Sequence, residues 1–91
     1  MKQQIYYLHS CNEWKENSSM SLLFIGTSKR KLKMKISKEI EEGNMEYSNS
    51  ELSQKEQAKK FRQDFDKRTN DELNGDLTYG CFDYTYNNED M

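Results

Sequence analysis

The chain lacks proline altogether and has only two cysteines, Cys11 and Cys81. Two cysteines are too few for the disulfide framework that stabilises many small secreted domains. Residues 1–11 contain no apolar stretch of the kind found in secretory signals, and no apolar run approaches the length of a membrane-spanning helix. We therefore expect a cytoplasmic protein, with no membrane association, whose thiols are reduced.

Apolar side chains are also scarce, since they make up 33% of the 91 residues and the mean hydropathy is -1.20. A domain of this length and polarity has a thin core, which favours pairing with a second copy or docking on a partner. Six Tyr, four Phe and one Trp compensate in part, because each aromatic ring buries a large area. We expect one domain over residues 1–91, monomeric or homodimeric, with a flexible tail at 87–91.

Three stretches have the pattern of β-strands. Residues 3–11 alternate in side-chain type and are rich in aromatic and β-branched residues. Residues 20–26 form an apolar run too short for a helix, and the polar segment before them predicts an antiparallel pair. Residues 77–86 have apolar or aromatic side chains on both faces, which is typical of a strand at the centre of a sheet or at an interface.

The basic segment between the second and third strands fits two patterns. Residues 31–36 alternate like a half-exposed strand, whereas apolar side chains recur every four residues from Leu32 to Ile40. The helix is preferred, because Ser28 or the threonine before it can cap the start and Gly43 stands where a left-handed cap belongs. Basic side chains at the helix N-terminus oppose its dipole, so the strand stays open as an alternative.

Residues 53–73 are predicted as one long second helix. Ser53 and Glu56 have the spacing of a capping box, apolar residues recur on one face, and an Asn-Gly pair follows. Thr69 takes the place of an apolar residue in that face. The predicted order is ββααβ, an α+β fold in which a three-stranded antiparallel sheet carries two helices on one face.

Candidate chemistry is limited to His9, Cys11 and Cys81. His9 and Cys11 share a strand face, and Cys81 would join them if the first and last strands pair, which gives three soft ligands for zinc. The same residues could supply a Cys–His nucleophile. The chain has no CxxC or HxxxH spacing and no recognisable oxyanion loop, so buried thiols and an ordinary histidine are preferred. We predict no enzymatic activity, catalytic residue, metal or cofactor.

Charge is segregated along the chain, although the net charge is only -2. One segment of ten residues has six basic and no acidic side chains: Lys29, Arg30, Lys31, Lys33, Lys35 and Lys38. The last sixteen residues have four acidic and no basic side chains. Segregation of this kind steers association with charged surfaces and says little about the fold.

The acidic, aromatic C-terminus is the preferred partner-binding surface. Tyrosine supplies contact area at low entropic cost, and neighbouring carboxylates steer and orient a basic partner. The predicted contact residues are Tyr79, Asp83, Tyr84, Tyr86, Glu89 and Asp90. The alternative is that the basic segment 29–38 binds nucleic-acid phosphates, with tyrosines as stacking faces. The negative net charge and the lack of a nucleic-acid-binding motif count against direct binding.

In size and composition the chain resembles small accessory proteins of phages and mobile elements, including inhibitors of the anti-CRISPR type. The features behind this resemblance are short length, absence of proline, many tyrosines, and a composition rich in Lys, Asn and Glu. The resemblance implies a non-enzymatic inhibitor that binds stoichiometrically to a larger protein or ribonucleoprotein of a host defence machine that handles nucleic acid. It rests on no residue motif, so it assigns no functional residue. The alternative is a small nucleic-acid-binding regulator that uses residues 29–38.

Overall fold

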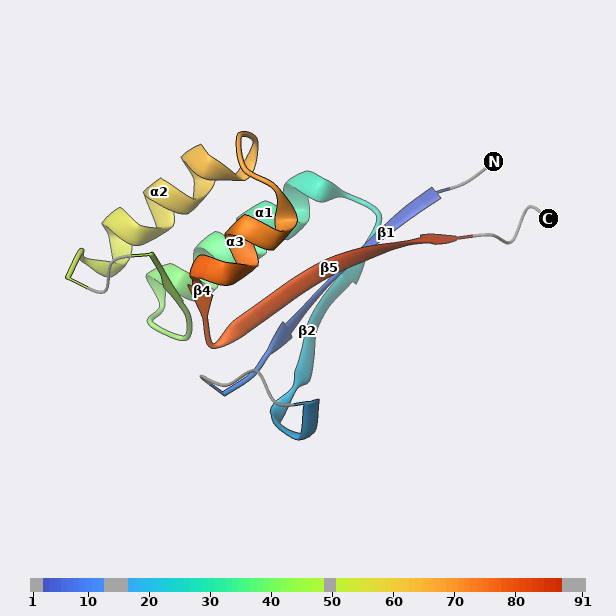
Figure 1. The fold of residues 1–91 in the computed structure, drawn as a ribbon, viewed down its shortest axis with the longest axis horizontal. Coiled ribbons are helices and arrows are strands. Elements are labelled where there is room, and N and C mark those ends of the chain that lie inside the picture. Colours follow the sequence, from blue (N-terminus) through green and yellow to red (C-terminus); the bar gives the residue numbers. More distant parts are fainter. Residues whose placement is uncertain (1–2, 13–16, 49–50, 88–91) are drawn as a thin grey trace.

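The computed structural model describes residues 3–12, 17–48 and 51–87. Its main sheet is antiparallel, in the order β2-β1-β5, and consists of β1 (Gln3–Ser10), β2 (Ser21–Gly26) and β5 (Gly80–Asn87). The helices beside it are α1 (Lys29–Glu41), α2 (Gln54–Phe65) and α3 (Asn70–Asp76) (Figure 1). The predicted α+β class and three-stranded antiparallel sheet are therefore confirmed. None of the helices among the described residues has the length and apolarity needed to cross a membrane.

The two faces of the main sheet differ. In the strand register Leu8 of β1 lies opposite Phe24 of β2 and Phe82 of β5, and all three side chains pack in the core with the helices. Helix α1 packs on β1 and β2, and α2 packs on α1. The other face carries Tyr7 and Ile25 and is not covered by α1, α2 or α3 (Figure 1). Ile25 is accordingly 64% exposed.

The basic segment is a helix, as preferred, and the strand alternative for residues 31–36 is wrong. The Ser28 hydroxyl accepts a hydrogen bond from the backbone N–H of Lys31 at 3.2 Å and so caps the first turn of α1. Every fourth side chain from Leu32 to Ile40 is buried. Gly43 has φ 82° just after the helix, which is the left-handed conformation that the sequence predicted there.

The single helix predicted over residues 53–73 is wrong, because the structure divides it into α2 and α3. Helix α2 begins after Ser53 and ends at Phe65. Thr69 then starts a new helix: its hydroxyl accepts from the backbone N–H of Glu72 at 3.2 Å, and the Glu72 carboxylate accepts from the Thr69 N–H at 3.1 Å. This reciprocal capping box satisfies N–H groups that have no acceptor within the helix itself.

The strand predicted over residues 77–86 is also divided. Its first part, β4 (Leu77–Thr78), pairs with β3 (Glu46–Tyr47) in a separate two-stranded sheet. Tyr79 has φ 70° and turns the chain between β4 and β5. A short 3₁₀ helix, η1 (Asn17–Ser19), precedes β2. The ββααβ order is therefore too simple, since the order of strands and α-helices is ββαβααββ.

The core joins all these elements around Phe61 of α2. The Phe61 ring lies edge-on to Tyr47 of β3, with centroids 5.1 Å apart, and edge-on to Phe82 of β5 at 6.3 Å. The buried cluster comprises Leu8, Leu32, Ile36, Ile40, Met45, Tyr47, Ala58, Phe61, Phe65, Leu73, Leu77 and Phe82. One aromatic side chain thus connects the two sheets through α2.

The two outer edges of the main sheet are treated differently. Along β5, the Asn74 side chain of α3 donates to the Phe82 carbonyl at 2.6 Å and accepts from its N–H at 3.0 Å. The next outward N–H, that of Tyr84, donates to the Asp83 carboxylate at 2.8 Å. Strand β2, at the other edge, has no charged side chain. Side chains therefore satisfy three outward backbone groups of β5, whereas β2 has none of the charges that usually protect an edge.

Candidate functional site

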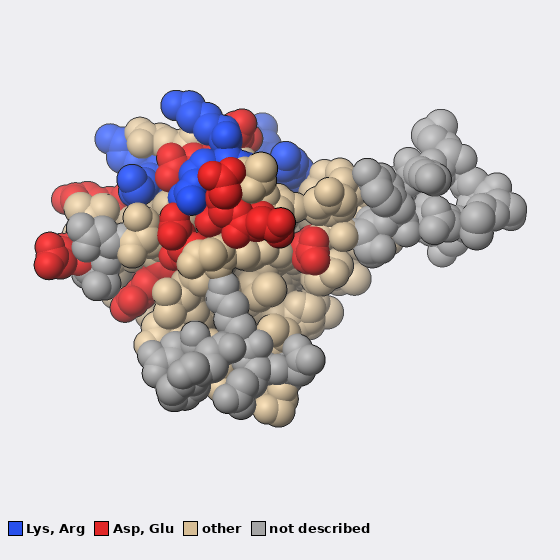
Figure 2. Space-filling view, in the orientation of Figure 1, with Lys and Arg blue, Asp and Glu red and all other residues tan. Residues whose placement is uncertain are grey.

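The basic residues gather on the helical layer. Figure 2 shows Lys and Arg over α1 and α2, and acidic side chains below them over α3 and toward β5. Within the basic segment, Lys33 pairs with Asp66 at 3.2 Å and Lys35 pairs with Glu39 at 3.0 Å. The Lys29 ammonium lies 5.5 Å from the centroid of the Phe65 ring. The remaining members of the segment are exposed on α1: Arg30, Lys31 and Lys38.

The acidic, aromatic residues predicted to bind a partner do not form one patch within the described chain. Tyr79 lies at the turn before β5 and is 37% exposed. Asp83 and Tyr84 lie further along β5 and are both exposed. The backbone of Tyr86 belongs to β5, but its side chain lies outside the described part, as do Glu89 and Asp90. The described members that lie together are Asp83 and Tyr84.

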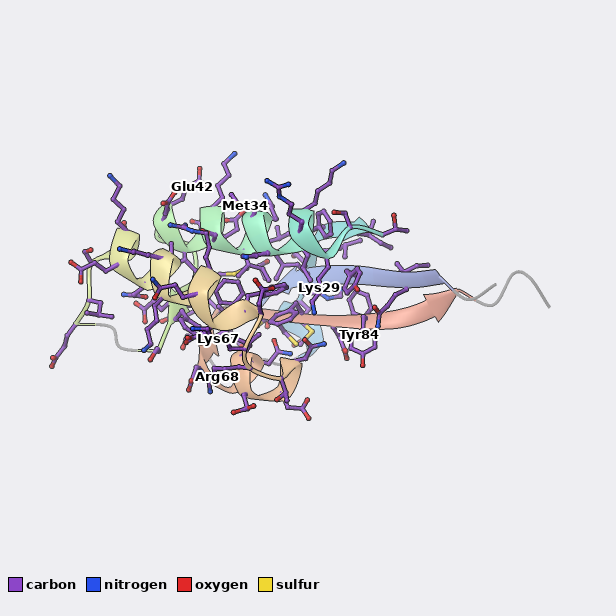
Figure 3. All side chains as sticks on the ribbon, turned by 90° about the horizontal axis from the view of Figure 1, so that it is seen from above. Lys29, Met34, Glu42, Lys67, Arg68 and Tyr84 are labelled. Atoms are coloured by element: carbon purple, nitrogen blue, oxygen red, sulfur yellow. The ribbon has the colours of Figure 1, made fainter. Side chains whose placement is uncertain are left out.

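A cleft of about 630 Å³ brings these two residues together with parts of three other elements. It lies where the N-terminal ends of α1 and α3 meet the β1–β5 pair, and Figure 3 labels three of its lining residues, Lys29, Arg68 and Tyr84. The residues that line it are Gln4, Tyr6, Lys29, Arg68, Thr69, Asn70, Asp71, Asp83 and Tyr84. The structure therefore places Lys29, from the predicted basic set, beside Asp83 and Tyr84 from the acidic one.

Two tyrosines form the aromatic wall of the cleft. Tyr6 of β1 and Tyr84 of β5 are opposite each other in the antiparallel register, with ring centroids 6.3 Å apart and an interplanar angle of 52°. The Tyr6 hydroxyl donates a hydrogen bond to the Gln4 side chain, which fixes the Tyr6 ring at the sheet side of the cleft. Tyr84 is 40% exposed. The cleft thus offers aromatic surface to a ligand that enters from solvent.

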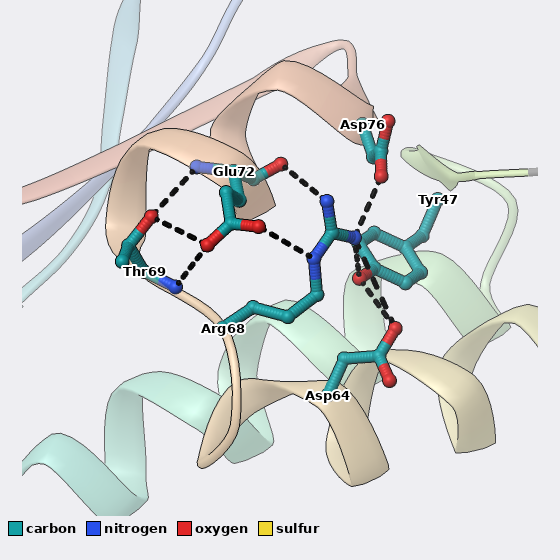
Figure 4. Close-up of polar contacts among 6 residues, drawn as sticks. All are labelled: Tyr47, Asp64, Arg68, Thr69, Glu72 and Asp76. Atoms are coloured by element: carbon teal, nitrogen blue, oxygen red, sulfur yellow. Dashed lines mark hydrogen bonds and ion pairs between the residues drawn. The ribbon is translucent and has the colours of Figure 1, made fainter.

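Arg68 lines the cleft, but three of its five N–H donors form hydrogen bonds inside the protein (Figure 4). Its Nη1 donates to the Asp76 carboxylate at 2.6 Å and to the Tyr47 hydroxyl at 2.9 Å, and its Nη2 donates to the Glu72 carbonyl at 3.3 Å. The hydrogen bond to Asp76, and then that to Tyr47, raises the pKa of the Arg68 guanidinium above its ordinary value. Arg68 therefore holds the α2–α3 connection and β3 together.

Sequence reasoning missed Arg68 as an organising residue. A signal was present, because Asp64 and Glu72 stand four residues before and after it, at the spacing of helical ion pairs. The signal pointed to one continuous helix. In the structure the helix is interrupted between α2 and α3, and the ion pairs of Arg68 with Asp64 and Glu72 hold the connection between them.

Tyr47 gives this junction a measurable pH dependence. Its buried hydroxyl donates to the Asp64 carboxylate at 2.8 Å. Burial, and then this hydrogen bond, raise the pKa of Tyr47 to about 12, above an ordinary value of 10.0. A raised folded-state pKa stabilises the fold fully below pH 10 and loses that contribution as pH rises toward 12. Between pH 10 and pH 12 the free energy of unfolding of the parent protein should therefore fall because Tyr47 ionises. In Tyr47→Phe we expect this fall to be smaller by up to about 2 kcal/mol.

The measurement is a tyrosinate absorbance titration combined with urea unfolding across the same pH window. One tyrosine should titrate after the others in the parent protein, and this late step should be missing in Tyr47→Phe. If the late step persists in the variant, another tyrosine is responsible for it.

His9 and the cysteines lie at the open face and the end of the sheet. The His9 ring lies edge-on to Tyr7 with centroids 5.6 Å apart, and His9 is opposite Cys81 in the strand register. Cys11 is buried beyond the end of β1, and its N–H donates to the Tyr79 carbonyl at 3.0 Å. Across residues 3–12, 17–48 and 51–87, no three His, Cys, Asp or Glu side chains are placed to hold a metal ion.

The chain matches no protein-family model, no curated protein and no solved structure. Its surfaces therefore have to be interpreted from their own chemistry. Two described surfaces that combine exposure with charge are the cleft beside β5 and the basic outer side of α1.

Proposed function

We propose that this protein acts in the cytoplasm as a non-enzymatic binding protein, stoichiometrically, on a larger protein or ribonucleoprotein with a basic surface. The observation that supports this most is the cleft, where the exposed Asp83 and Tyr84 stand beside Tyr6 and Asp71. Tyrosine surface flanked by carboxylates suits recognition of a basic protein. The resemblance in size and composition suggests that the partner belongs to a host defence machine that handles nucleic acid, which the protein inhibits in an anti-CRISPR-like manner.

The charge around the cleft supports a basic partner. Arg68 and Lys29 are its two cations. Five carboxylates either line the cleft or contact Arg68: Asp64, Asp71, Glu72, Asp76 and Asp83. The excess of negative charge extends over α3 in Figure 2. A local field of this sign accelerates encounter with a cationic surface and slows encounter with nucleic acid.

The second candidate is a nucleic-acid-binding regulator that uses residues 29–38. The observation in its favour is the exposure of Arg30, Lys31 and Lys38 on α1. Against it, Lys33 and Lys35 already pair with carboxylates, which lowers the number of cations that can release counterions from a phosphate backbone. We therefore rank it below the protein-binding proposal.

Charge reversals separate the two candidates. We expect Asp83→Lys to weaken capture of the partner from an extract of the native host by about tenfold, because it places a cation where a basic partner docks. The double variant Arg30→Glu, Lys31→Glu should have a much smaller effect. Glu42→Lys is the matched control, because Glu42 is exposed at the far end of α1 and the change in net charge is the same as for Asp83→Lys. Thermal unfolding of each variant checks that the fold persists.

Oligonucleotide binding provides the opposite outcome. A sub-micromolar complex with DNA or RNA that weakens steeply with salt, and that is abolished by the Arg30/Lys31 double reversal, would replace the protein-binding proposal by the nucleic-acid one. Capture that fails equally with Asp83→Lys and with Glu42→Lys would show that only net charge matters.

A further inference from the structure

We infer that the cleft between α1, α3 and the β1–β5 pair is a receptor for the guanidinium of an arginine side chain that a partner inserts into it. This inference rests on the proposed function, which it narrows to one chemical group. Three features of the cleft carry it: the aromatic wall, the carboxylates of Asp71 and Asp83 on different elements, and the internal hydrogen bonds that already hold Arg68.

The aromatic wall has the geometry that a planar cation needs. Tyr6 and Tyr84 are neighbours across two strands and are tilted by 52° to each other, so a flat group that enters between α3 and the sheet meets ring surface. A guanidinium within about 6 Å of such a ring is attracted to the negative face of its π-system. Arginine also stacks on aromatic rings, whereas lysine presents a compact, strongly hydrated charge.

The carboxylates come from different elements and line the same cleft. Asp83 is opposite Tyr7 in the register and so leaves β5 on the open face, but its Oδ1 accepts from the Tyr84 N–H at 2.8 Å, which brings the carboxylate to the outer edge of β5 that borders the cleft. Asp71 lies in the first turn of α3, is exposed, and makes no ion pair among the residues that the structure describes. A guanidinium presents several N–H donors in one plane, so it can reach carboxylates on two sides at once.

An anion fits the same cleft poorly. The Arg68 donors bind Asp76, Tyr47 and the Glu72 carbonyl. The backbone N–H groups of Thr69 and Glu72 are already bonded within the capping box. The cation that remains is Lys29, which lies over the Phe65 ring and shares the cleft with two carboxylates. A phosphate would meet this one ammonium and the backbone N–H groups of Asn70 and Asp71, together with two like charges, so the cleft favours a cation over an anion.

The test uses isotope-labelled full-length protein and the blocked amino acid N-acetyl-arginine amide, followed by two-dimensional amide NMR. We expect saturable shifts at the amides of Thr69, Asn70 and Tyr84, which surround the cleft. The lysine analogue should bind several-fold more weakly, because its ammonium cannot bridge both rims or stack. Inorganic phosphate should leave these amides unchanged. Arginine-induced shifts that lie elsewhere, or tighter binding of phosphate at these amides, would overturn the inference.

Neutral variants test the two rims. Asp71→Asn and Asp83→Asn should each weaken arginine binding about threefold, since each removes one exposed ion pair and keeps the size of the side chain. Glu42→Gln is the matched control, since it removes an exposed carboxylate at the C-terminal cap of α1. If Glu42→Gln weakens arginine binding as much as the two cleft variants do, the net charge alone explains the loss. That result would contradict a specific arginine site.

The result is separable from that of the partner experiment, because the probe needs no partner. If arginine does not bind the cleft but Asp83→Lys still disrupts capture, the inference fails and the proposed function stands. If arginine binds the cleft but Asp83→Lys leaves capture intact, the cleft is an arginine site. In that case the captured partner binds elsewhere on the protein.

Discussion

Replacing Phe61 by alanine should lower the free energy of unfolding by about 3–5 kcal/mol. Phe61 is fully buried, and its ring touches the rings of Tyr47, Phe65 and Phe82. Its removal leaves a cavity between α2 and both sheets, which cannot close without moving three aromatic side chains. A domain of this length has a total stability of roughly 5–14 kcal/mol, so the loss is a large fraction of it.

Urea unfolding followed by far-ultraviolet circular dichroism measures this effect. The control is Met34→Ala, because Met34 is 51% exposed on α1 and points away from the sheet (Figure 3). This variant should change the free energy of unfolding by less than about 0.5 kcal/mol. Similar midpoints for Phe61→Ala and Met34→Ala would mean that the aromatic cluster is not the centre of the core.

Gly80→Ala should destabilise the protein by about 1–3 kcal/mol through overpacking. Gly80 begins β5 immediately after the turn at Tyr79. A Cβ at this position would lie 2.5 Å from Sδ and 2.7 Å from Cε of Met45, closer than real contacts allow. Met45 is itself buried, so its flexible side chain has little space into which it can move.

A double-mutant cycle tests the stated cause. Met45→Ala alone should cost about 2–5 kcal/mol by opening a cavity. The double variant Gly80→Ala, Met45→Ala should cost clearly less than the two single changes together, because the new methyl group enters the space that Met45 has left. Additive losses, measured by urea unfolding, would show that the cost of Gly80→Ala arises from the strand backbone instead.

Local signals in the sequence account for the elements that were predicted correctly. In the main sheet, β1 follows from alternation and aromatic content, β2 from a short apolar run, and β5 from its apolar and aromatic faces. Helix α1 follows from the Ser28 cap, its apolar spacing and Gly43. The break between α2 and α3 was missed because Thr69 and Glu72 have a spacing that fits both a helix interior and a capping box. In a helix interior the backbone at Thr69 would be helical, whereas as an N-cap it is extended. The side-chain spacing is the same in both cases, so it does not distinguish them.

The division of the last strand was hidden for a different reason. Tyr79 adopts a positive φ, which sequence patterns assign to Gly or Asn and not to tyrosine. The bond between β3 and β4 joins residues about thirty positions apart, so it depends on tertiary packing. The strand with two apolar faces is an edge strand, and α3 lies along its outer edge in place of a further strand.

The candidate site was predicted in its parts and not in its assembly. Composition and charge singled out Asp83, Tyr84 and Lys29 before the fold was known. The sequence gives no sign that Tyr6 and Asp71 share a cleft with them, because these five residues come from four separate elements. Each had an ordinary surface role available on its own, and only the fold makes them neighbours.

The unequal edges of the main sheet limit how copies of the chain can assemble. A filament that grows by strand addition needs two receptive edges on every copy, so that each can join a neighbour on either side. On the β5 side, Asn74 already occupies the outward N–H and carbonyl of Phe82, and Asp83 occupies the outward N–H of Tyr84. In the main sheet, strand addition is therefore easier at β2 than at β5. In the described part of the main sheet, two copies joined by their β2 strands would leave only β5 edges whose outward groups are partly occupied, which favours a closed pair over a fibre by this route.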